Sequence, residues 1–309
     1  MSAFETLYHL MTALPKADGT LSSELVEVVR NIRTGNRQCL LAFPPKVAGT
    51  FLRTALVELL GQHYESYLSR GAYANVTLSH DLYFPTLLNQ HIVSGTRPGA
   101  AVMHLHLNPS RHTTALVEAF DIPVVIGTRD ILDTLVSAKN MCDAAPPTEA
   151  DSFSALGAPW HDLTEAEQRH VLVHVLPAWY ARFYGAWMRY SVDCHVRGLR
   201  PPLWLRYDDL VAQPVDLIGA ILTHVDPTHT YAPADIAAVH ERTRRKKADV
   251  RLNKGISGRG EAYFTPEEKE IIHQALRSAG EREMIGLGIL PDPAVSARYD
   301  APAVPQVAE

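Results

Sequence analysis

Short apolar runs alternate along the chain with longer segments of helical periodicity. Four runs rich in Val, Ile, Leu and Ala indicate buried strands, at residues 38–43, 100–107, 122–128 and 202–206. Each run is followed by a segment with apolar residues at helical spacing, and we expect helices at residues 50–61, 110–120, 130–141 and about 208–225. Continuous apolar strands that alternate with helices are typical of a parallel sheet covered on both faces. The pattern therefore predicts an α/β fold of three layers, α/β/α, with a central parallel sheet.

The segments outside this alternation are expected to belong to the same domain. Residues 22–33 form an amphipathic pattern that predicts a helix, and residues 164–198 predict one or two helices. The aromatic residues of 164–198 recur at helical spacing, which favours core packing over a ligand site. We expect a single domain over residues 1–290, followed by a flexible tail at 291–309, where several Pro and Ala gather.

Composition and charge narrow the class of function. Of the 309 residues, 46% are hydrophobic and 20% charged, which is typical of a globular protein and excludes a disordered chain, a coiled coil and a collagen-like fibre. The formal net charge is −5. Because nucleic-acid-binding domains are usually basic, we expect no nucleic-acid partner. A small anionic ligand needs only a few local cations and stays compatible with this charge.

Cysteine usage and hydropathy indicate the compartment. Cys39, Cys142 and Cys194 show neither metal-ligand spacing nor a disulfide framework, so we expect free thiols and no metal site. No apolar run approaches the length of about 18 residues that a membrane helix needs, and the N-terminal residues do not have the pattern of a signal peptide. The sequence predicts a cytoplasmic protein without a membrane span.

The loop after the first predicted strand is the most informative stretch. Residues 43–51 read Phe-Pro-Pro-Lys-Val-Ala-Gly-Thr-Phe and join a buried strand to a helix N-terminus. The backbone N–H groups and the dipole at such a terminus favour a bound anion. Gly49 allows close approach of an oxyanion, Thr50 adds a hydroxyl donor and Lys46 adds a positive charge. The loop predicts a phosphate or sulfate site, and it differs from the Walker pattern because Lys46 precedes Gly49.

A second candidate anion contact follows the third predicted strand. Arg129 stands at the end of that strand, and Ser137 follows eight residues later in the next predicted helix. Asp133 lies midway, so that Asp133 and Ser137 share one helix face. A guanidinium can bind a phosphate through two hydrogen bonds, and a serine hydroxyl can donate to the same group. Arg129 and Ser137 are therefore predicted to bind a phosphate.

Together with a third, glycine-rich stretch, these elements resemble the motifs of the cytosolic-type sulfotransferases that use 3′-phosphoadenosine 5′-phosphosulfate (PAPS). Residues 45–50 match the family's P-K-x-x-G-T loop, and residues 129–137 match its R-(x)3-D-(x)3-S element. Residues 251–260 resemble its R-K-G-x-x-G loop, although Asn253 stands where the family has Arg. The resemblance covers about residues 38–290. It implies a P-loop-like α/β/α domain that uses PAPS and releases adenosine 3′,5′-bisphosphate (PAP).

The resemblance also assigns roles to residues. Lys46 would stabilise the leaving phosphate, and Arg251 or Arg259 would take over the phosphate contact of the missing Arg. The segment 142–190 would be a helical insertion on the acceptor side. The implied cofactor-binding residues are Lys46, Ala48, Gly49, Thr50, Phe51, Arg129, Ser137, Arg251, Lys254, Gly255 and Arg259.

Transfer to a hydroxyl needs a base, and two histidines of the second predicted strand are candidates. His104 and His106 share a face, because side chains alternate along a strand. His106 lies nearer the carboxyl end of the strand, where α/β sheets bind their ligands. It also aligns with the His of the family's K-T-H-L-P pattern, in which His104 replaces the Lys. His106 is the predicted base and His104 the alternative, while His80 is a candidate for acceptor contact.

The leading hypothesis is a PAPS-dependent sulfotransferase that transfers a sulfuryl group in line to a hydroxyl of a small-molecule, lipid, polyketide or glycolipid acceptor. One alternative is a P-loop-type nucleotide kinase or other phosphotransferase, which predicts a Lys after the loop glycine. The other is a non-catalytic nucleotide-binding relative, which would lose Lys46 or the histidine, both of which are present here. The acceptor and the oligomeric state are left open.

Overall fold

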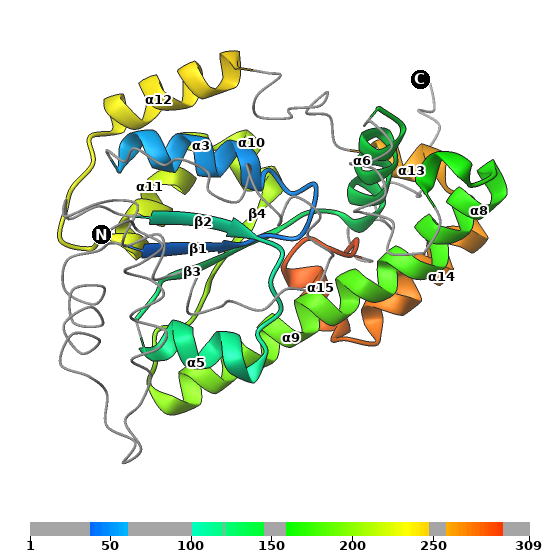
Figure 1. Ribbon diagram of the computed structural model, residues 1–309, viewed down its shortest axis with the longest axis horizontal. Helices are drawn as coiled ribbons and strands as arrows, with labels where there is room; N and C mark the ends of the chain where they lie inside the picture. Colours follow the sequence, from blue (N-terminus) through cyan, green and yellow to red (C-terminus); the bar gives the residue numbers. More distant parts are fainter. Residues whose placement is uncertain (1–37, 61–100, 120, 145–158, 247–257, 293–309) are drawn as a thin grey trace, which may run out of the picture.

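A sheet of four parallel strands lies at the centre of the protein (Figure 1). The computed structural model describes residues 38–60, 101–119, 121–144, 159–246 and 258–292. The strands are ordered β2-β1-β3-β4, with bounds Gln38–Ala42 (β1), Ala101–Leu105 (β2), Val124–Thr128 (β3) and Leu203–Arg206 (β4). Each of the four predicted apolar runs forms one of these strands, and the predicted three-layer α/β/α fold with a central parallel sheet is confirmed.

Helices cover both faces of the sheet. One face is covered by α3 (Gly49–Leu59), α10 (Tyr207–Ala212) and α11 (Pro214–Val225), with α12 (Pro233–Arg245) packed outside α3 and α11. The other face is covered by α5 (Arg111–Ala119) and the long helix α9 (Leu176–Arg197). Side chains alternate along the strands, so Leu40 and Ala42 of β1 pack on the α9 side, whereas Cys39 and Leu41 pack on the α3 side.

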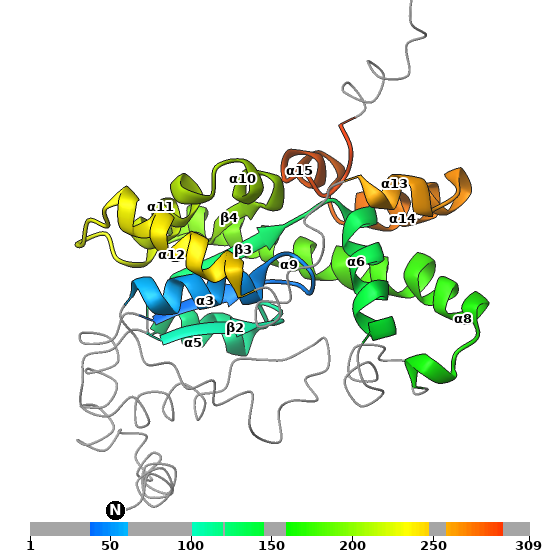
Figure 2. The same ribbon diagram turned by 90° about the horizontal axis from the view of Figure 1, so that it is seen from above.

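A second group of helices lies beyond the carboxyl ends of the strands (Figure 2). It consists of α6 (Ile131–Ala144), α8 (Glu165–His170), α13 (Arg259–Tyr263), α14 (Pro266–Arg277) and α15 (Glu281–Gly286). Helix α9 begins among these helices and runs back along the sheet. The group therefore faces the edge of the sheet at which open α/β folds bind their ligands.

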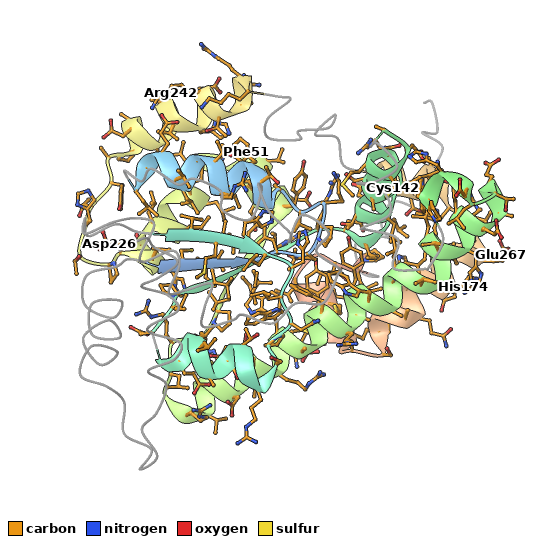
Figure 3. The ribbon with its side chains drawn as sticks, viewed as in Figure 1. Phe51, Cys142, His174, Asp226, Arg242 and Glu267 are labelled. Atoms are coloured by element: carbon orange, nitrogen blue, oxygen red, sulfur yellow. The ribbon has the colours of Figure 1, made fainter. Side chains whose placement is uncertain are left out.

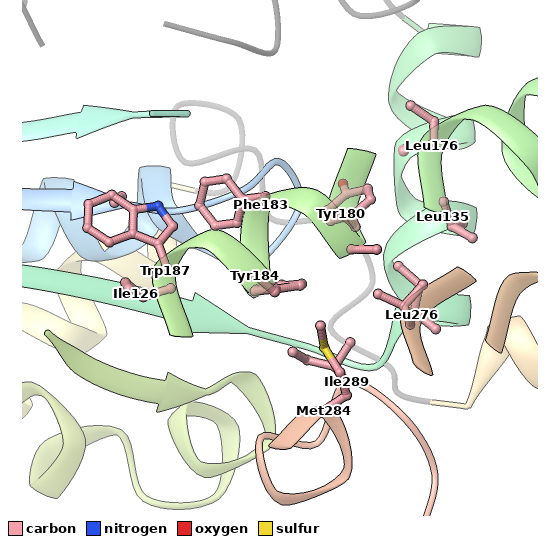
Figure 4. Close-up of a cluster of buried hydrophobic side chains, with 14 of the residues drawn as sticks. Ile126, Leu135, Leu176, Tyr180, Phe183, Tyr184, Trp187, Leu276, Met284 and Ile289 are labelled. Atoms are coloured by element: carbon pink, nitrogen blue, oxygen red, sulfur yellow. The ribbon is translucent and has the colours of Figure 1, made fainter. Parts of the chain in front are cut away.

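Aromatic side chains of α9 pack in the core against the sheet (Figure 4). Four of them are almost completely buried: Tyr180, Phe183, Tyr184 and Trp187. The prediction that the aromatic residues of this segment pack in the core is confirmed for these four. None of the helices in the described ranges is long and apolar enough to span a bilayer.

Two predicted helical stretches differ in detail from the structure. The stretch expected at 208–225 is broken at Gln213, whose φ is −137° and ψ is 60°, because the residue before Pro214 is driven out of the helical region. Within 164–198, a π-helical turn at Val171–Val175 joins α8 to α9. The expected helix at 22–33 lies outside the described residues, as does the predicted tail at 291–309 apart from its first two residues.

Candidate active site

The loop between β1 and α3 has two non-glycine residues in the left-handed region. Lys46 has a φ of 71° and Ala48 a φ of 67°. Each such residue costs roughly 1–2 kcal/mol, and strain of this kind persists only where surrounding contacts enforce it. Two contacts reach this loop: the Tyr180 hydroxyl donates to the Pro45 carbonyl oxygen at 3.0 Å, and Arg129 Nη1 donates to the Lys46 carbonyl oxygen at 3.2 Å. The loop is therefore held in a strained conformation from the side of α9 and β3.

The N-terminus of α3 is suited to an anion. Its N-cap residue is Ala48, which has no side-chain oxygen to accept from the first-turn N–H groups. Gly49 begins the helix, and a Cβ at this position would overlap the His104 ring, only 2.8 Å from its Cδ2. A residue with a Cβ at position 49 would have to displace the His104 ring, and the first turn of α3 presents N–H donors next to this imidazole.

His104 and His106 lie on one face at the carboxyl end of β2, as predicted. Their ring centroids are 5.4 Å apart, with the rings perpendicular. His106 Nδ1 lies 2.6 Å from the Phe43 carbonyl oxygen. A carbonyl only accepts hydrogen bonds, so Nδ1 carries the proton, and in the neutral ring Nε2 carries the lone pair. This tautomer is the one in which Nε2 can accept a proton.

The Lys46 charge acts on a residue of α6. Burial raises the pKa of the Cys142 thiol to about 12 and Asp143 adds to this rise, whereas the Lys46 and Lys139 ammonium groups oppose it. Cys142 lies on the last turn of α6 (Figure 3). The Lys46 charge therefore acts between the β1 loop and α6, beyond the carboxyl ends of the strands.

Arg129 is buried at the end of β3, with 7% of its surface exposed. Its guanidinium carbon lies 4.3 Å from the centre of the Tyr207 ring, and Nη2 lies 3.9 Å from Asp133 Oδ2. Among the described residues, nothing accepts a hydrogen bond from its buried Nε. A buried guanidinium with donor capacity left over is a suitable partner for an anionic ligand.

Asp133 joins α6 to residues 258–260, which we call the glycine segment. Asp133 Oδ2 accepts from the Gly258 N–H and Oδ1 from the Gly260 N–H, each at 2.8 Å. Asp133 itself is 1% exposed. The sequence placed this residue between Arg129 and Ser137 but gave it no partner, because the two glycines lie 125 and 127 residues further along the chain.

Some of the other predicted site residues can be placed in the structure, and others lie outside the described residues. The Phe51 side chain packs in the core against His240 of α12, so only its backbone N–H is available to a ligand (Figure 3). Ser137 is buried in α6, one turn after Asp133. Arg259 begins α13 and has a buried Nε that finds no acceptor within the described part of the chain. Four further predicted residues lie outside the described ranges: His80, Arg251, Lys254 and Gly255.

This chain is similar to solved protein structures, but it matches no family model and no curated protein by sequence. The crystal structure of mouse sulfotransferase SULT7A1 complexed with PAP is similar over 87% of this chain and 92% of that chain, with 15% identity and a TM-score of 0.54. This chain has the sulfotransferase fold.

Two crystal structures of retinol dehydratase support the same fold. The complex with androsterone and the inactive cofactor PAP aligns over 94% of this chain and 96% of that chain, with 14% identity and a TM-score of 0.50. The complex with retinol and PAP aligns over 95% and 97%, with 13% identity and the same TM-score of 0.50. The resemblance predicted from three short motifs is thus confirmed for the sulfotransferase fold.

Proposed function

We propose that this protein is a PAPS-dependent sulfotransferase that transfers a sulfuryl group to a hydroxyl of a small-molecule acceptor. The observation that carries the proposal is the direct hydrogen bond from Arg129 to the Lys46 carbonyl oxygen. It brings the strained loop between β1 and α3 (residues 43–48), which we call the anion loop, next to a buried guanidinium. A ligand with an anionic group at each end needs two such sites close together. The structural neighbours, at low identity, are crystal structures of sulfotransferase SULT7A1 and retinol dehydratase that contain PAP.

In this proposal the two anion sites hold the two ends of the nucleotide. The first turn of α3, from Ala48 to Phe51, donates its backbone N–H groups to the 5′-phosphosulfate, and Lys46 and Thr50 add side-chain donors. Arg129, Ser137 and Arg259 hold the 3′-phosphate, together with Arg251, Lys254 and Gly255. PAPS supplies an activated sulfuryl group, and Lys46 stabilises the negative charge that grows on the leaving phosphate.

His106 is the proposed base. The hydrogen bond from its Nδ1 to the Phe43 carbonyl oxygen fixes the ring in the tautomer whose Nε2 can accept the proton of a hydroxyl acceptor. His104 lies over Gly49 and is the alternative, because its ring adjoins the N-terminus of α3 directly. The acceptor would be a hydroxylated small molecule, a lipid, a polyketide or a glycolipid. One neighbour, retinol dehydratase, binds androsterone and retinol.

The proposal is tested by calorimetric titration of the full chain with PAP and with AMP, which lacks the 3′-phosphate. Each charge-assisted hydrogen bond contributes about 1.5–3 kcal/mol, so we expect PAP to bind at least about tenfold more tightly than AMP. Arg129→Gln should remove most of this preference. The matched control is Arg200→Gln, since Arg200 is a partly exposed arginine paired with Asp121 away from the loop.

Equal affinities for PAP and AMP in the wild-type protein would contradict the proposal. A preference for ATP over both nucleotides would instead favour the nucleotide kinase alternative. An acceptor screen with labelled PAPS then identifies the substrate and distinguishes an active enzyme from a nucleotide-binding relative without activity.

A further inference from the structure

We propose that Asp133 is a positioning residue that aligns the glycine segment with Arg129 and thereby sets the preference for nucleotides with a 3′-phosphate. The inference rests on the proposed function, because it concerns the same nucleotide. It goes beyond it by assigning a role to a carboxylate that is not expected to touch the ligand, and that would repel a phosphate if it did.

The hydrogen bonds of Asp133 match its chemistry. An ionised carboxylate has two acceptor oxygens and no donor, and each oxygen of Asp133 accepts one backbone N–H of the glycine segment at 2.8 Å. Bonds between a charged acceptor and backbone N–H groups are stronger than neutral ones. The carboxylate therefore fixes the position and the orientation of the start of α13 relative to α6.

The backbones of the two elements also fit closely. A Cβ at Gly260 would overlap Leu132 and would lie 2.6 Å from the Asp133 backbone nitrogen. A side chain at this position is therefore excluded by the backbone of α6 and not by a movable side chain. Gly258 reaches its place with a φ of 86°, which only glycine adopts readily. Two glycines thus allow the segment to lie directly on the helix that follows Arg129.

The same carboxylate also faces Arg129. Asp133 Oδ2, which accepts from Gly258, lies 3.9 Å from Arg129 Nη2, and both side chains are buried. Burial of a charge is costly unless opposite charge or donors surround it, and here the guanidinium and two N–H groups do so. Arg129 is held in turn by the Lys46 carbonyl oxygen and by the Tyr207 ring.

Asp133 therefore aligns two ligand-facing elements directly, and a third only through Arg129. The glycine segment ends the 251–260 stretch, Arg129 directly follows β3, and the anion loop is bonded to Arg129. If Asp133 is lost, we expect the glycine segment and Arg129 to lose their common reference while the first turn of α3 keeps its place. The loss should therefore affect the 3′-phosphate much more than the 5′-phosphate.

The experiment compares the affinities of PAP and AMP for the full chain and its variant Asp133→Asn. Asparagine offers one acceptor and turns an NH₂ group toward the second backbone N–H, so one of the two bonds is replaced by a donor–donor contact. We expect the dissociation constant of PAP to rise about tenfold or more, which corresponds to the loss of one charged hydrogen bond, and that of AMP to change less than about twofold.

The matched control is Thr265→Ala, which removes the N-cap of α14 close to the glycine segment. The Thr265 hydroxyl accepts from the Glu268 N–H, and its loss should lower thermal stability without touching Asp133. The ratio of PAP to AMP affinity should stay at the wild-type value in this control. A ratio that falls equally in both variants would show general destabilisation and would overturn the inference.

A second variant perturbs the same hydrogen bond at its donor, Gly258. Gly258→Ala meets no atom within 4 Å but is strained at a φ of 86°, so it should shift the segment without a steric overlap. We expect the PAP to AMP ratio to fall in the same direction by a smaller factor. An unchanged ratio in both Asp133→Asn and Gly258→Ala would overturn the inference. Failure of the proposed function itself would be distinct, since the wild-type protein would then show no preference for PAP.

Discussion

At the scale of single residues, Asp130 is a carboxylate whose charge opposes folding. It precedes α6, and its Oδ1 accepts the Asp133 N–H at 2.9 Å, as an N-cap does. Burial raises the pKa of Asp130 to about 6, and the negative charges of Asp133 and Asp208 raise it further. The hydrogen bond from the Asp133 N–H and the positive charge of Arg129 act in the opposite direction. Between about pH 4 and 6 the folded state therefore binds a proton that the unfolded chain has released.

Asp130→Asn should remove this pH dependence. The wild-type protein loses stability as the pH rises through that window, whereas asparagine is an equally good N-cap and does not titrate. Because the carboxylate is only partly buried, we expect the variant to be more stable by about 1 kcal/mol at pH 7.5 and by almost nothing at pH 4. Urea unfolding at the two pH values measures the difference. A gain of the same size at both would contradict the account.

The histidine pair gives a second prediction at this scale. His106→Gln should lower the turnover of sulfuryl transfer by about 10²–10⁴-fold, the usual contribution of a general base, because glutamine cannot accept a proton. The affinity for PAP, measured by calorimetry, should change less than about twofold, since a base for the acceptor does not hold the nucleotide. His104→Gln is the matched control on the same strand face. A larger loss of turnover in His104→Gln would assign the base to His104.

Contacts that depend on neighbouring residues can be predicted from the sequence, whereas contacts between distant parts of the chain cannot. The common face of His104 and His106 follows from the period of a strand, which is a local property. The anion loop is equally local, because it depends on a strand, a loop and a helix N-terminus in succession. The bonds of Asp133 to Gly258 and Gly260 are not local, since they depend on how α6 and α13 meet. The sequence did contain a signal for these bonds: an acidic residue within the motif at 129–137 and two closely spaced glycines much later in the chain.

At the scale of elements, α9 contacts the loops that follow two strands and the backbone of a third strand. Tyr180 donates to the Pro45 carbonyl oxygen after β1, and Trp187 Nε1 donates to the Leu107 carbonyl oxygen after β2 at 2.9 Å. The Tyr184 hydroxyl lies 3.5 Å from the Gly127 carbonyl oxygen of β3. These polar groups are buried, and they explain why the helix carries Tyr and Trp rather than aliphatic residues alone.

Tyr180→Phe should therefore loosen the anion loop. Removal of the hydroxyl leaves the Pro45 carbonyl without this donor, which should lower the free energy of unfolding by about 1–2 kcal/mol. Because the same bond helps to hold Lys46 and Ala48 in their strained conformation, we also expect weaker binding of PAP by a few fold. Urea unfolding and calorimetry measure the two effects. Tyr190→Phe, on the same helix, should leave PAP binding unchanged, and an equal loss in both variants would refute the role of the loop contact.

The elements themselves were predictable where the signal was local and strong. The four strands stand out because each is a continuous apolar run followed by a helical segment. The break at Gln213 was marked by Pro214, but the apolar period continues across it and favoured one helix. The π-helical turn at Val171–Val175 has its signal in Pro177, two residues further on, which has no backbone N–H to donate to the Val173 carbonyl, but the continuous helical pattern favoured one or two ordinary helices.

At the scale of the whole molecule, the protein combines a sheet with helices on both faces and a group of helices beyond the strand ends. The sheet layer supplies the anion loop, the histidines and Arg129. The group beyond it supplies Asp133 and the glycine segment. The candidate site is thus formed where the two parts meet, and it depends on how α6 and α13 pack on the strand ends. Sequence motifs identified the contributors from both parts but not this packing.

The contacts of α9 have a consequence for redesign and for evolutionary drift. The inward surface of α9 bonds the turns that follow β1 and β2. Substitutions on this surface would reshape both turns together, so changes in selectivity are better sought at outward positions or in other segments. A lineage that changed this helix would have to readjust several turns in concert.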